Sequence, residues 1–308
     1  MRRTILAATT AITLALSVAT VSAQGAWTTG PEMPSPRAEV GAALVDNSTY
    51  VIGGGVGASQ RANEVLDLTT NQWRTATDMP RGLNHMGTVS AYGRLFAFGG
   101  ADERGGATDA ALSYAPDTNS WIEYPPLPTR RSSPGAAVLQ DGIYVVGGIA
   151  ARNTPVMEII DPTTGEWRTG PSMAVARDHF VLAPVDGKLY AIGGRIGNAA
   201  RNLDTVEIFD PATQTWSFGA PLPQARSGIA GAVVGSNVYI FGGEDPGQTY
   251  GDVFIYDTVS DTWTTGTPMP NPRHGLAAVY ANGYIHVFGG GLSPGGGSDT
   301  ALHEIMTP

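Results

Sequence analysis

The 308 residues include 42% hydrophobic and 15% charged side chains, a balance that excludes a disordered chain and a typical membrane protein. The net charge of -9 makes nucleic acid and other polyanions unsuitable partners. The chain has no cysteine, so it has no disulfides, thiolate metal sites or cysteine nucleophile, and its stability must come from burial and hydrogen bonding.

The first 23 residues have the three parts of a secretory signal peptide. Arg2-Arg3 is followed by an uncharged run over residues 5–18 and by a small-x-small site over residues 21–23. The alternative, an uncleaved membrane anchor, fits less well because the run contains several Thr and Ser and lacks stop-transfer charges. We predict Sec-type export, cleavage after Ala23, and a secreted or periplasmic chain of residues 24–308. This mature chain is expected to form a single domain without a membrane span.

All six tryptophans stand 26 residues before the first glycine of a Gly-Gly pair. The tryptophans are Trp27, Trp73, Trp121, Trp167, Trp216 and Trp263, and the pairs begin at Gly53, Gly99, Gly147, Gly193, Gly242 and Gly289. The interval from each pair to the next Trp varies between 20 and 23 residues, so length variation is confined to one loop per repeat. One structural unit is therefore copied six times.

Each unit has the pattern of four β-strands. In the third unit, Gly135–Leu139 and the apolar run Ile143–Val146 are the first two strands. The first two strands of a unit are joined by residues that accept positive φ, as at Asp46-Asn47, Asp141-Gly142, Asp186-Gly187 and Asn282-Gly283. A third strand, such as Val206–Asp210, leads to a fourth that begins at the Trp. Six such units without a helical period predict an all-β, six-bladed propeller with four antiparallel strands per blade.

The two ends of the chain together supply the four strands of the last blade. Trp27 opens the mature chain with a fourth strand only, whereas Gly289-Gly290 is followed by a third strand near Ala301–Ile305 and by no Trp. We therefore predict that the strand from Ala26 to Thr29 becomes the outer strand of the last blade and removes the open edge of the ring.

These repeats resemble the Kelch repeat family, whose signature is a glycine pair after the second strand and an aromatic residue about seven positions before the Trp. The aromatic residue is present as Tyr114, Phe209 and Tyr256. Leu66 and Ile160 take its place in two other repeats. The resemblance covers the chain from the first Trp to the C-terminus and implies a six-bladed Kelch propeller.

An arginine stands ten residues after the Trp in five repeats, and a glutamate stands nine residues before the Trp in three. These residues are Arg37, Arg131, Arg177, Arg226 and Arg273, with Glu64, Glu158 and Glu207. A repeated cation near the channel entrance could serve a ligand, but the recurring glutamates favour structural salt bridges. The second repeat departs from the pattern with Leu83. We interpret the glycine pairs and tryptophans as structural as well.

Function is expected where the six copies differ. In a four-stranded meander, the connections from strand four into strand one and from strand two into strand three emerge on one face, around the mouth of the central channel. Residues just after the repeated arginine are polar and unequal there, and the position just after the glycine pair is filled differently from blade to blade. They supply the ten predicted ligand-binding residues: Glu39, Asn84, His85, Ser132, Asp178, His179, Arg195, Ser227, Glu244 and His274. The alternative is that these are solvated loop residues without a ligand.

No cofactor and no metal site are predicted. The five histidines lack metal-ligand spacing in the sequence, although His85, His179 and His274 could approach one another across the mouth. The copper radical oxidases that share the Kelch propeller need a Cys linked to Tyr, which this chain cannot build. Gly291–Gly295 matches G-x-S-x-G, but no helix follows it, so it is not interpreted as a nucleophile elbow.

Two functions remain open. The first, which we favour because it needs only the polar mouth, is an exported recognition module that binds a peptide, a glycan or a protein partner. The second is a sugar isomerase resembling, in architecture and export, the exported Kelch mutarotases that interconvert the anomers of sialic acid (N-acetylneuraminate). The candidate catalytic acids and bases for that chemistry are Glu39, His85, His179 and Glu244. Arg195 is the candidate cation for the sugar carboxylate.

Overall fold

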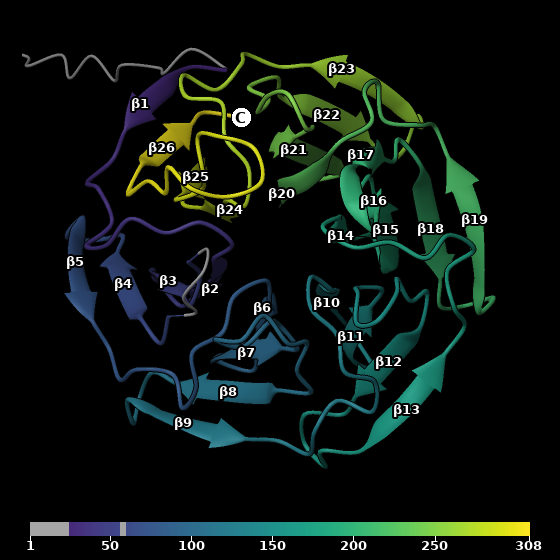
Figure 1. Cartoon of the computed structure of the whole chain (residues 1–308), viewed down its shortest axis with the longest axis horizontal. Coiled ribbons are helices and arrows are strands. Elements are labelled where there is room, and N and C mark those ends of the chain that lie inside the picture. The colour runs from purple at the N-terminus through teal and green to yellow at the C-terminus, as the bar shows by residue number, and fades with distance from the viewer. Residues whose placement is uncertain (1–24, 56–59) are drawn as a thin grey trace, which may run out of the picture.

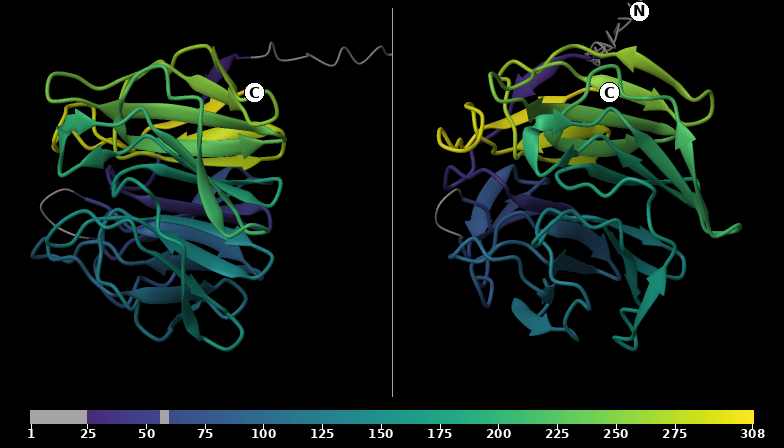
Figure 2. Two further views of the ribbon diagram at one scale, coloured as in Figure 1. Left: turned by 90° about the vertical axis from the view of Figure 1, so that its right-hand side faces the viewer. Right: turned by 45° about the vertical axis from the view of Figure 1, so that its right-hand side comes forward.

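The computed structural model describes residues 25–55 and 60–308. Within these residues, six four-stranded antiparallel sheets surround a central channel, with a small additional two-stranded hairpin (Figure 1). Seen from the side, the strands end in loops on both faces of the ring (Figure 2). The predicted six-bladed propeller is therefore confirmed. The signal peptide predicted over residues 1–23 lies outside the described residues.

Five blades follow one another along the chain, each running as a meander from the channel outward. Blade 1 contains β2 (Gly41–Val45), β3 (Ser48–Ile52), β4 (Asn63–Asp67) and β5 (Gln72–Thr75). Blade 2 contains β6 (Gly87–Ala91), β7 (Arg94–Phe98), β8 (Ala111–Ala115) and β9 (Ser120–Glu123). Blade 3 contains β10 (Gly135–Leu139), β11 (Gly142–Val146), β12 (Met157–Ile160) and β13 (Trp167–Gly170). Blade 4 contains β14 (Val181–Val185), β15 (Lys188–Ile192), β18 (Val206–Asp210) and β19 (Thr215–Gly219), with the hairpin β16 (Arg195–Ile196) and β17 (Asn198–Asn202) inserted. Blade 5 contains β20 (Ser227–Val234), β21 (Asn237–Glu244), β22 (Phe254–Asp257) and β23 (Thr262–Thr265).

The sixth blade joins the two ends of the chain. Its strands are β24 (Ala277–Ala281), β25 (Tyr284–Phe288), β26 (His303–Met306) and the N-terminal β1 (Trp27–Thr29). The outer strand β1 pairs antiparallel with β26, with Trp27 opposite Met306, which confirms the predicted closure. The third strand of this blade begins at His303, two residues later than expected, and the Ala301 carbonyl instead accepts a hydrogen bond from the Met33 amide at 2.8 Å.

The hydrophobic core is divided among the junctions between blades. Six clusters of buried side chains occur in the described residues, and each combines residues of two neighbouring blades. The innermost strands are rich in Gly and Ala, as in β2 (GAALV) and β10 (GAAVL), because six strands converge on a narrow channel. Burial thus holds each blade against the next one around the ring.

The glycine pairs and tryptophans also link neighbouring blades. Both glycines of every pair have positive φ. The second glycine donates its N–H to the carbonyl at the repeated arginine position of the next blade, as Gly148 does to Arg177 at 2.8 Å. A Cβ on Gly148 would lie 2.7 Å from the Ser132 carbonyl oxygen, so only glycine fits there. Each Trp indole donates to a carbonyl just beyond the outer strand of the preceding blade, as Trp121 does to Thr77 at 2.8 Å.

The repeated arginines are fully buried structural cations. Four of them pair with a buried glutamate: Arg37–Glu64, Arg131–Glu158, Arg177–Glu207 and Arg273–Glu304. In blade 5 the Arg226 guanidinium instead lies 4.5 Å from the ring centres of both Tyr250 and Phe254. In blade 2, Leu83 and Leu112 occupy the two positions, and both are buried. The structural interpretation of the arginines is confirmed.

Candidate functional site

Six residues, one from each blade, close a ring of backbone hydrogen bonds across the mouth of the channel. We call them the mouth ring: Glu39, His85, Ser133, His179, Gly228 and Gly275. Each amide donates to the carbonyl oxygen of the preceding member, with N···O distances from 2.6 to 3.3 Å, and the Glu39 amide closes the circle onto Gly275. All six residues have φ between 53° and 66°, in the left-handed region.

Side chains in the mouth ring come at a cost in stability. The left-handed conformation costs a residue with a Cβ about 1–2 kcal/mol, whereas glycine adopts it freely, as at Gly228 and Gly275. Glu39, His85, Ser133 and His179 nevertheless carry side chains. Backbone strain that is maintained in this way is typical of functional positions, so the structure singles out these four residues.

We expect Ser133→Gly to raise the free energy of unfolding by about 0.5–1 kcal/mol, since the lost hydroxyl contact with His179, at 3.3 Å, offsets only part of the relieved backbone strain. Gly228→Ala should lower the free energy of unfolding. Alanine would be strained in the left-handed conformation, and its Cβ would lie 3.3 Å from the Cβ of His274. Denaturant unfolding of both variants measures the two changes. A destabilised Ser133→Gly variant would contradict the cost assigned to the ring.

The two sequence positions predicted to line the mouth lie side by side. The residue after the repeated arginine position bridges antiparallel to the first residue after the glycine pair in five blades. The pairs are Asn84–Ala101, Ser132–Ile149, Asp178–Arg195, Ser227–Glu244 and His274–Gly291. The two connections therefore emerge on the same face, as the meander predicts.

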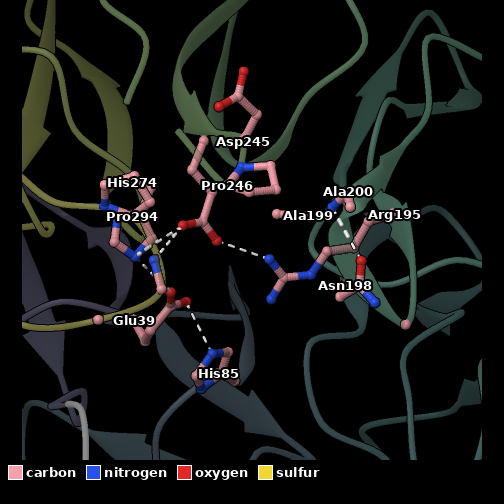
Figure 3. A pocket seen from close by; sticks show the side chains of 14 residues that line it. Glu39, His85, Arg195, Asn198, Ala199, Ala200, Asp245, Pro246, His274 and Pro294 are labelled. Carbon is pink, nitrogen blue, oxygen red and sulfur yellow. Dashed lines mark hydrogen bonds and ion pairs between the residues drawn. The ribbon is translucent and has the colours of Figure 1, made fainter. Parts of the chain in front are cut away.

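A cavity of about 440 Å³ lies against the mouth ring (Figure 3). Its polar lining includes Glu39, His85, Arg195, Glu244, Asp245 and His274. The β16–β17 hairpin contributes residues 197–200, and the loop 294–296 forms another part of the wall. Beyond the ring, the channel is lined by apolar side chains such as Val40, Met86 and Phe180. The polar groups are thus concentrated on the mouth side.

Arg195 is the only arginine or lysine that lines this cavity in the described residues, and each of its three nitrogens already has a partner. One terminal nitrogen donates to Glu244 Oε1 at 2.7 Å, and Nε donates to Asp178 Oδ1 at 3.2 Å. The other terminal nitrogen lies 2.8 Å from His179 Nε2. Two carboxylates therefore neutralise Arg195, and Glu39 and Asp245 add further negative charge to the mouth.

The three histidines of the site present the same ring nitrogen to the mouth. His85 Nδ1 lies 2.7 Å from Asn84 Oδ1, whose amide nitrogen donates to the Gly55 carbonyl. His179 Nδ1 contacts Asp178 Oδ1, and His274 Nδ1 lies 3.1 Å from the carbonyl oxygen of Gly291. Each of these partners accepts a hydrogen bond, so Nδ1 carries the proton and Nε2 faces inward.

The Glu39 carboxylate is opposite these Nε2 atoms. It lies 3.3 Å from His85 and 3.8 Å from His274, and only 11% of the side chain is exposed. Burial raises the pKa of Glu39, but the charges of His85, His179, His274 and Arg195 outweigh it and lower the pKa to about 2. Burial lowers the pKa of His85 to about 4, although Glu39 opposes this shift. At neutral pH an ionised carboxylate thus faces a neutral imidazole.

The structure brings most of the predicted site residues together. Glu39, His85, Arg195, Glu244 and His274 line the cavity, and His179 lies in the mouth ring. Asn84 and Asp178 stand behind the ring and orient its histidines.

Two of the predicted residues lie away from the cavity. Ser132 donates to the Ile149 carbonyl at 3.4 Å, and Ser227 donates to Asn202 Oδ1 at 2.7 Å. Neither lines the cavity, because their side chains are used within the loops. Their ligand-binding role, like that of the other predicted residues, stays a prediction.

Sequence reasoning missed several residues of the cavity wall. These are residues 197–200 of the β16–β17 hairpin, Asp245, Pro246 and the loop 294–296. The sequence does indicate an insertion at the hairpin, because the 23 residues from Gly193 to Trp216 are the longest interval between a glycine pair and the next Trp. No sequence pattern predicts that the loop 294–296 lies at the cavity. In the structure, the Gly295 amide donates to Glu244 Oε2 at 2.7 Å.

Comparison with known proteins is consistent with a Kelch propeller. The family profile of the KLHDC2/KLHL20/DRC7 Kelch-repeats domain matches residues 9–176 and 157–290, so the chain belongs to the Kelch repeat family. Kelch-like protein terF of Aspergillus terreus is 32% identical over 196 residues, which cover 56% of this chain and 43% of that protein. Beta-scruin of Limulus polyphemus is 27% identical over 180 residues, which cover 53% of this chain and 19% of that protein. The matches thus span less than half the length of these relatives.

The fold also matches a solved structure, that of YjhT, with a TM-score of 0.77. The match covers 91% of this chain and 96% of that one at 17% identity, so it establishes the fold alone. Within the described residues, no helix has the length and apolar character needed to cross a bilayer.

Proposed function

We propose that this chain is an exported Kelch recognition module whose mouth cavity receives a basic side chain from a protein partner. Kelch propellers generally bind proteins, which supports the class of partner. The observation that carries the proposal is the charge of the cavity. Glu39, Glu244 and Asp245 line it, whereas its single guanidinium, Arg195, is already paired with two carboxylates.

A lysine or arginine side chain fits this environment in charge and size. The cavity of about 440 Å³ is within the range of small-ligand sites. Glu244 accepts hydrogen bonds from Arg195 and Gly295. Among the residues that the structure describes, the Glu39 carboxylate has only imidazole nitrogens as partners, at 3.3 and 3.8 Å. Glu39 is therefore the carboxylate that is available to an entering cation.

The test is a titration of short peptides, with a central Lys or with Gln in its place, into residues 24–308 in the presence of EDTA. We expect the Lys peptides to bind more tightly, and Glu39→Gln to weaken their binding at least tenfold, about 1.4 kcal/mol. Glu166→Gln, which removes an exposed charge in the β12–β13 turn, is the matched control. Equal affinity for both peptides, or an unaffected Glu39→Gln variant, would exclude this mode of recognition.

A second candidate function is anomer exchange of a sugar. The close approach of the Glu39 carboxylate to His85 supports it, because this chemistry needs a proton donor and acceptor in one cavity. The pairing of Arg195 with Asp178 and Glu244 argues against an acidic sugar such as sialic acid. Magnetisation-transfer NMR on neutral and acidic sugars measures the exchange. Acceleration by the wild-type chain that His85→Gln abolishes would establish catalysis.

The export part of the proposal has its own measurement. The charge and hydropathy pattern of residues 1–23 supports it. Expression of the full chain in a bacterium, followed by mass analysis of the exported protein, should give a product that begins at Gln24. Retention of the chain with residues 1–23 intact would contradict export by this route.

A further inference from the structure

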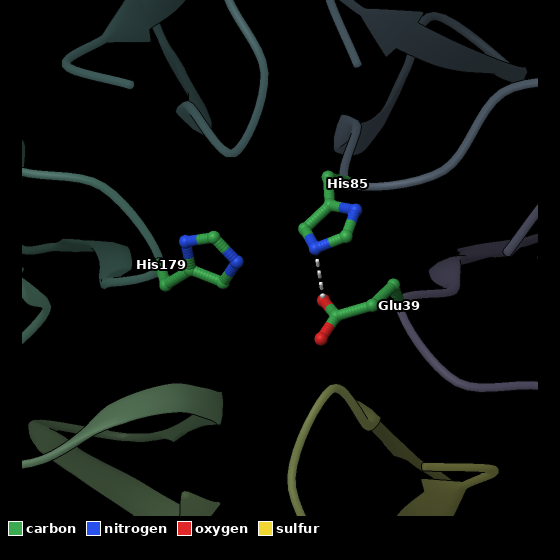
Figure 4. A group of neighbouring side chains, drawn as sticks. All are labelled: Glu39, His85 and His179. Carbon is green, nitrogen blue, oxygen red and sulfur yellow. Dashed lines mark ion pairs between the residues drawn. The ribbon is translucent and has the colours of Figure 1, made fainter. Parts of the chain in front are cut away.

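We propose that Glu39, His85 and His179 bind a divalent transition-metal ion, with Zn²⁺ as the best match, at the point where the mouth ring meets the cavity. One donor atom of each residue lies within 4.8 Å of the others (Figure 4). All three residues belong to the mouth ring and so come from different blades. This departs from the sequence-based expectation of no metal site, although that analysis noted that His85, His179 and His274 could approach one another across the mouth.

The tautomers of the two histidines leave their lone pairs where a metal would sit. Asn84 and Asp178 hold the Nδ1 protons of His85 and His179, so Nε2 of each ring is an acceptor. Metal-ligating histidines almost always have such a partner on the other nitrogen, a carboxylate or carbonyl oxygen that orients the ring. The two pairs thus already have the arrangement that metal ligation requires.

The donor atoms of two of the three ligands face each other. His85 Nε2 and Glu39 Oε2 are 3.3 Å apart, and both are acceptors when the imidazole is neutral and the carboxylate ionised. Two ligands of a tetrahedral ion at 2.0–2.1 Å are themselves separated by about 3.3–3.4 Å. A cation between them would satisfy both atoms, whereas no described protein group donates to either one.

The third ligand needs a small rearrangement. His179 Nε2 lies 2.8 Å from a terminal nitrogen of Arg195 and 3.3 Å from Ser133 Oγ, and a metal ion would take the place of both hydrogen bonds. Arg195 would keep its contacts with Glu244 and Asp178. Three protein ligands leave a coordination position toward the cavity, as in zinc sites that bind water or a ligand group. Imidazole and carboxylate donors suit Zn²⁺, Co²⁺ and Ni²⁺ rather than Ca²⁺ or Mg²⁺.

The experiment is a titration of EDTA-treated and dialysed residues 24–308 with Zn²⁺ by calorimetry and with Co²⁺ by visible absorption. We expect one ion per chain, the visible bands of a low-coordinate Co²⁺ site, and a melting temperature that rises with the Zn²⁺ concentration. His85→Gln and His179→Gln should lose all three signals, and Asp178→Asn should weaken affinity by about 10- to 100-fold. Arg195→Gln should tighten binding, because Arg195 competes for His179 and repels the ion.

Two variants control for folding and for other histidines. Glu166→Gln removes an exposed charge far from the mouth, and His286→Phe removes the other buried histidine pair, in which His286 lies 3.0 Å from His303. Both should bind the ion as the wild-type chain does. The proposal is overturned if folded wild-type protein takes up no Co²⁺, if both glutamine variants keep wild-type affinity, or if His286→Phe abolishes binding. Because these titrations contain no peptide and the peptide titrations contain EDTA, this proposal and the peptide proposal fail independently.

Discussion

Replacing Arg177 by leucine is expected to lower the free energy of unfolding by about 3–5 kcal/mol, because it leaves the Glu207 carboxylate buried without its cation. The guanidinium has no exposed surface, lies 2.5 Å from Glu207 and donates to the carbonyls of Gly193 and Thr205. Glu207 also accepts from two backbone amides, so its charge cannot move into solvent. Glu207→Leu should have an effect of similar size. Urea unfolding of both variants measures these losses.

The double variant Arg177→Leu with Glu207→Leu tests whether the loss of stability in each single variant comes from an unpaired buried charge. Blade 2 already carries Leu83 and Leu112 at the two positions, which shows that a blade can be built with an apolar pair. The double variant should therefore lose less stability than the sum of the two single variants, although the backbone groups that the pair served remain unpaired. In blade 2, which lacks the arginine, the Thr108 hydroxyl donates a hydrogen bond to one such backbone carbonyl, that of Gly99, at 2.9 Å.

An exposed ion pair is the control for this experiment. Arg168 pairs with Asp141 on the surface, where both side chains are about half exposed. Arg168→Leu is expected to change stability by less than about 1 kcal/mol. If Arg177→Leu had an equally small effect, or if the two leucine substitutions in blade 4 were additive, the buried pairs would not hold the blades as inferred.

Removing residues 24–34 should lower the melting temperature by roughly 10–20 °C, since the loss of about 5 kcal/mol from a domain of this size corresponds to such a shift. The deletion removes β1 from the sixth blade and leaves β26 as an open edge. It also removes Trp27, which packs edge-on against Phe241 and donates to Thr267, and the buried Met33. Thermal unfolding of chains that begin at residue 24 or at residue 35 measures the effect.

A peptide added in trans distinguishes the loss of the β1 strand from a general destabilisation of the shortened chain. If β1 acts as the missing strand of blade 6, a synthetic peptide of residues 24–34 should bind the shortened chain by strand addition and restore stability in a concentration-dependent way. A peptide with Trp27→Ala should restore less, because the contacts with Phe241 and Thr267 are lost. A shortened chain with an unchanged melting temperature would show that the ring does not depend on this closure.

The mouth illustrates how far the sequence alone could lead. The chain connections alone predict that Glu39, His85, His179 and Arg195 lie on one face. Their roles then diverged, since Arg195 is neutralised by Asp178 and Glu244, whereas Glu39 faces only imidazole nitrogens. No spacing in the sequence shows that Arg195 is paired with carboxylates or that Glu39 faces imidazoles, because partners such as Glu244 and His85 come from other blades.

The sequence by itself determined the number of blades, the strands of each, the closure through the N-terminal strand and the structural role of the repeated arginines. These features repeat locally, and the period of apolar residues, glycines and tryptophans is imposed by contacts that every blade makes in the same way. Only the tertiary structure decided that six left-handed residues join in one hydrogen-bonded ring and that Glu39, His85 and His179 converge. Such convergence depends on closing the ring, which brings together segments that lie 46 or more residues apart in the chain.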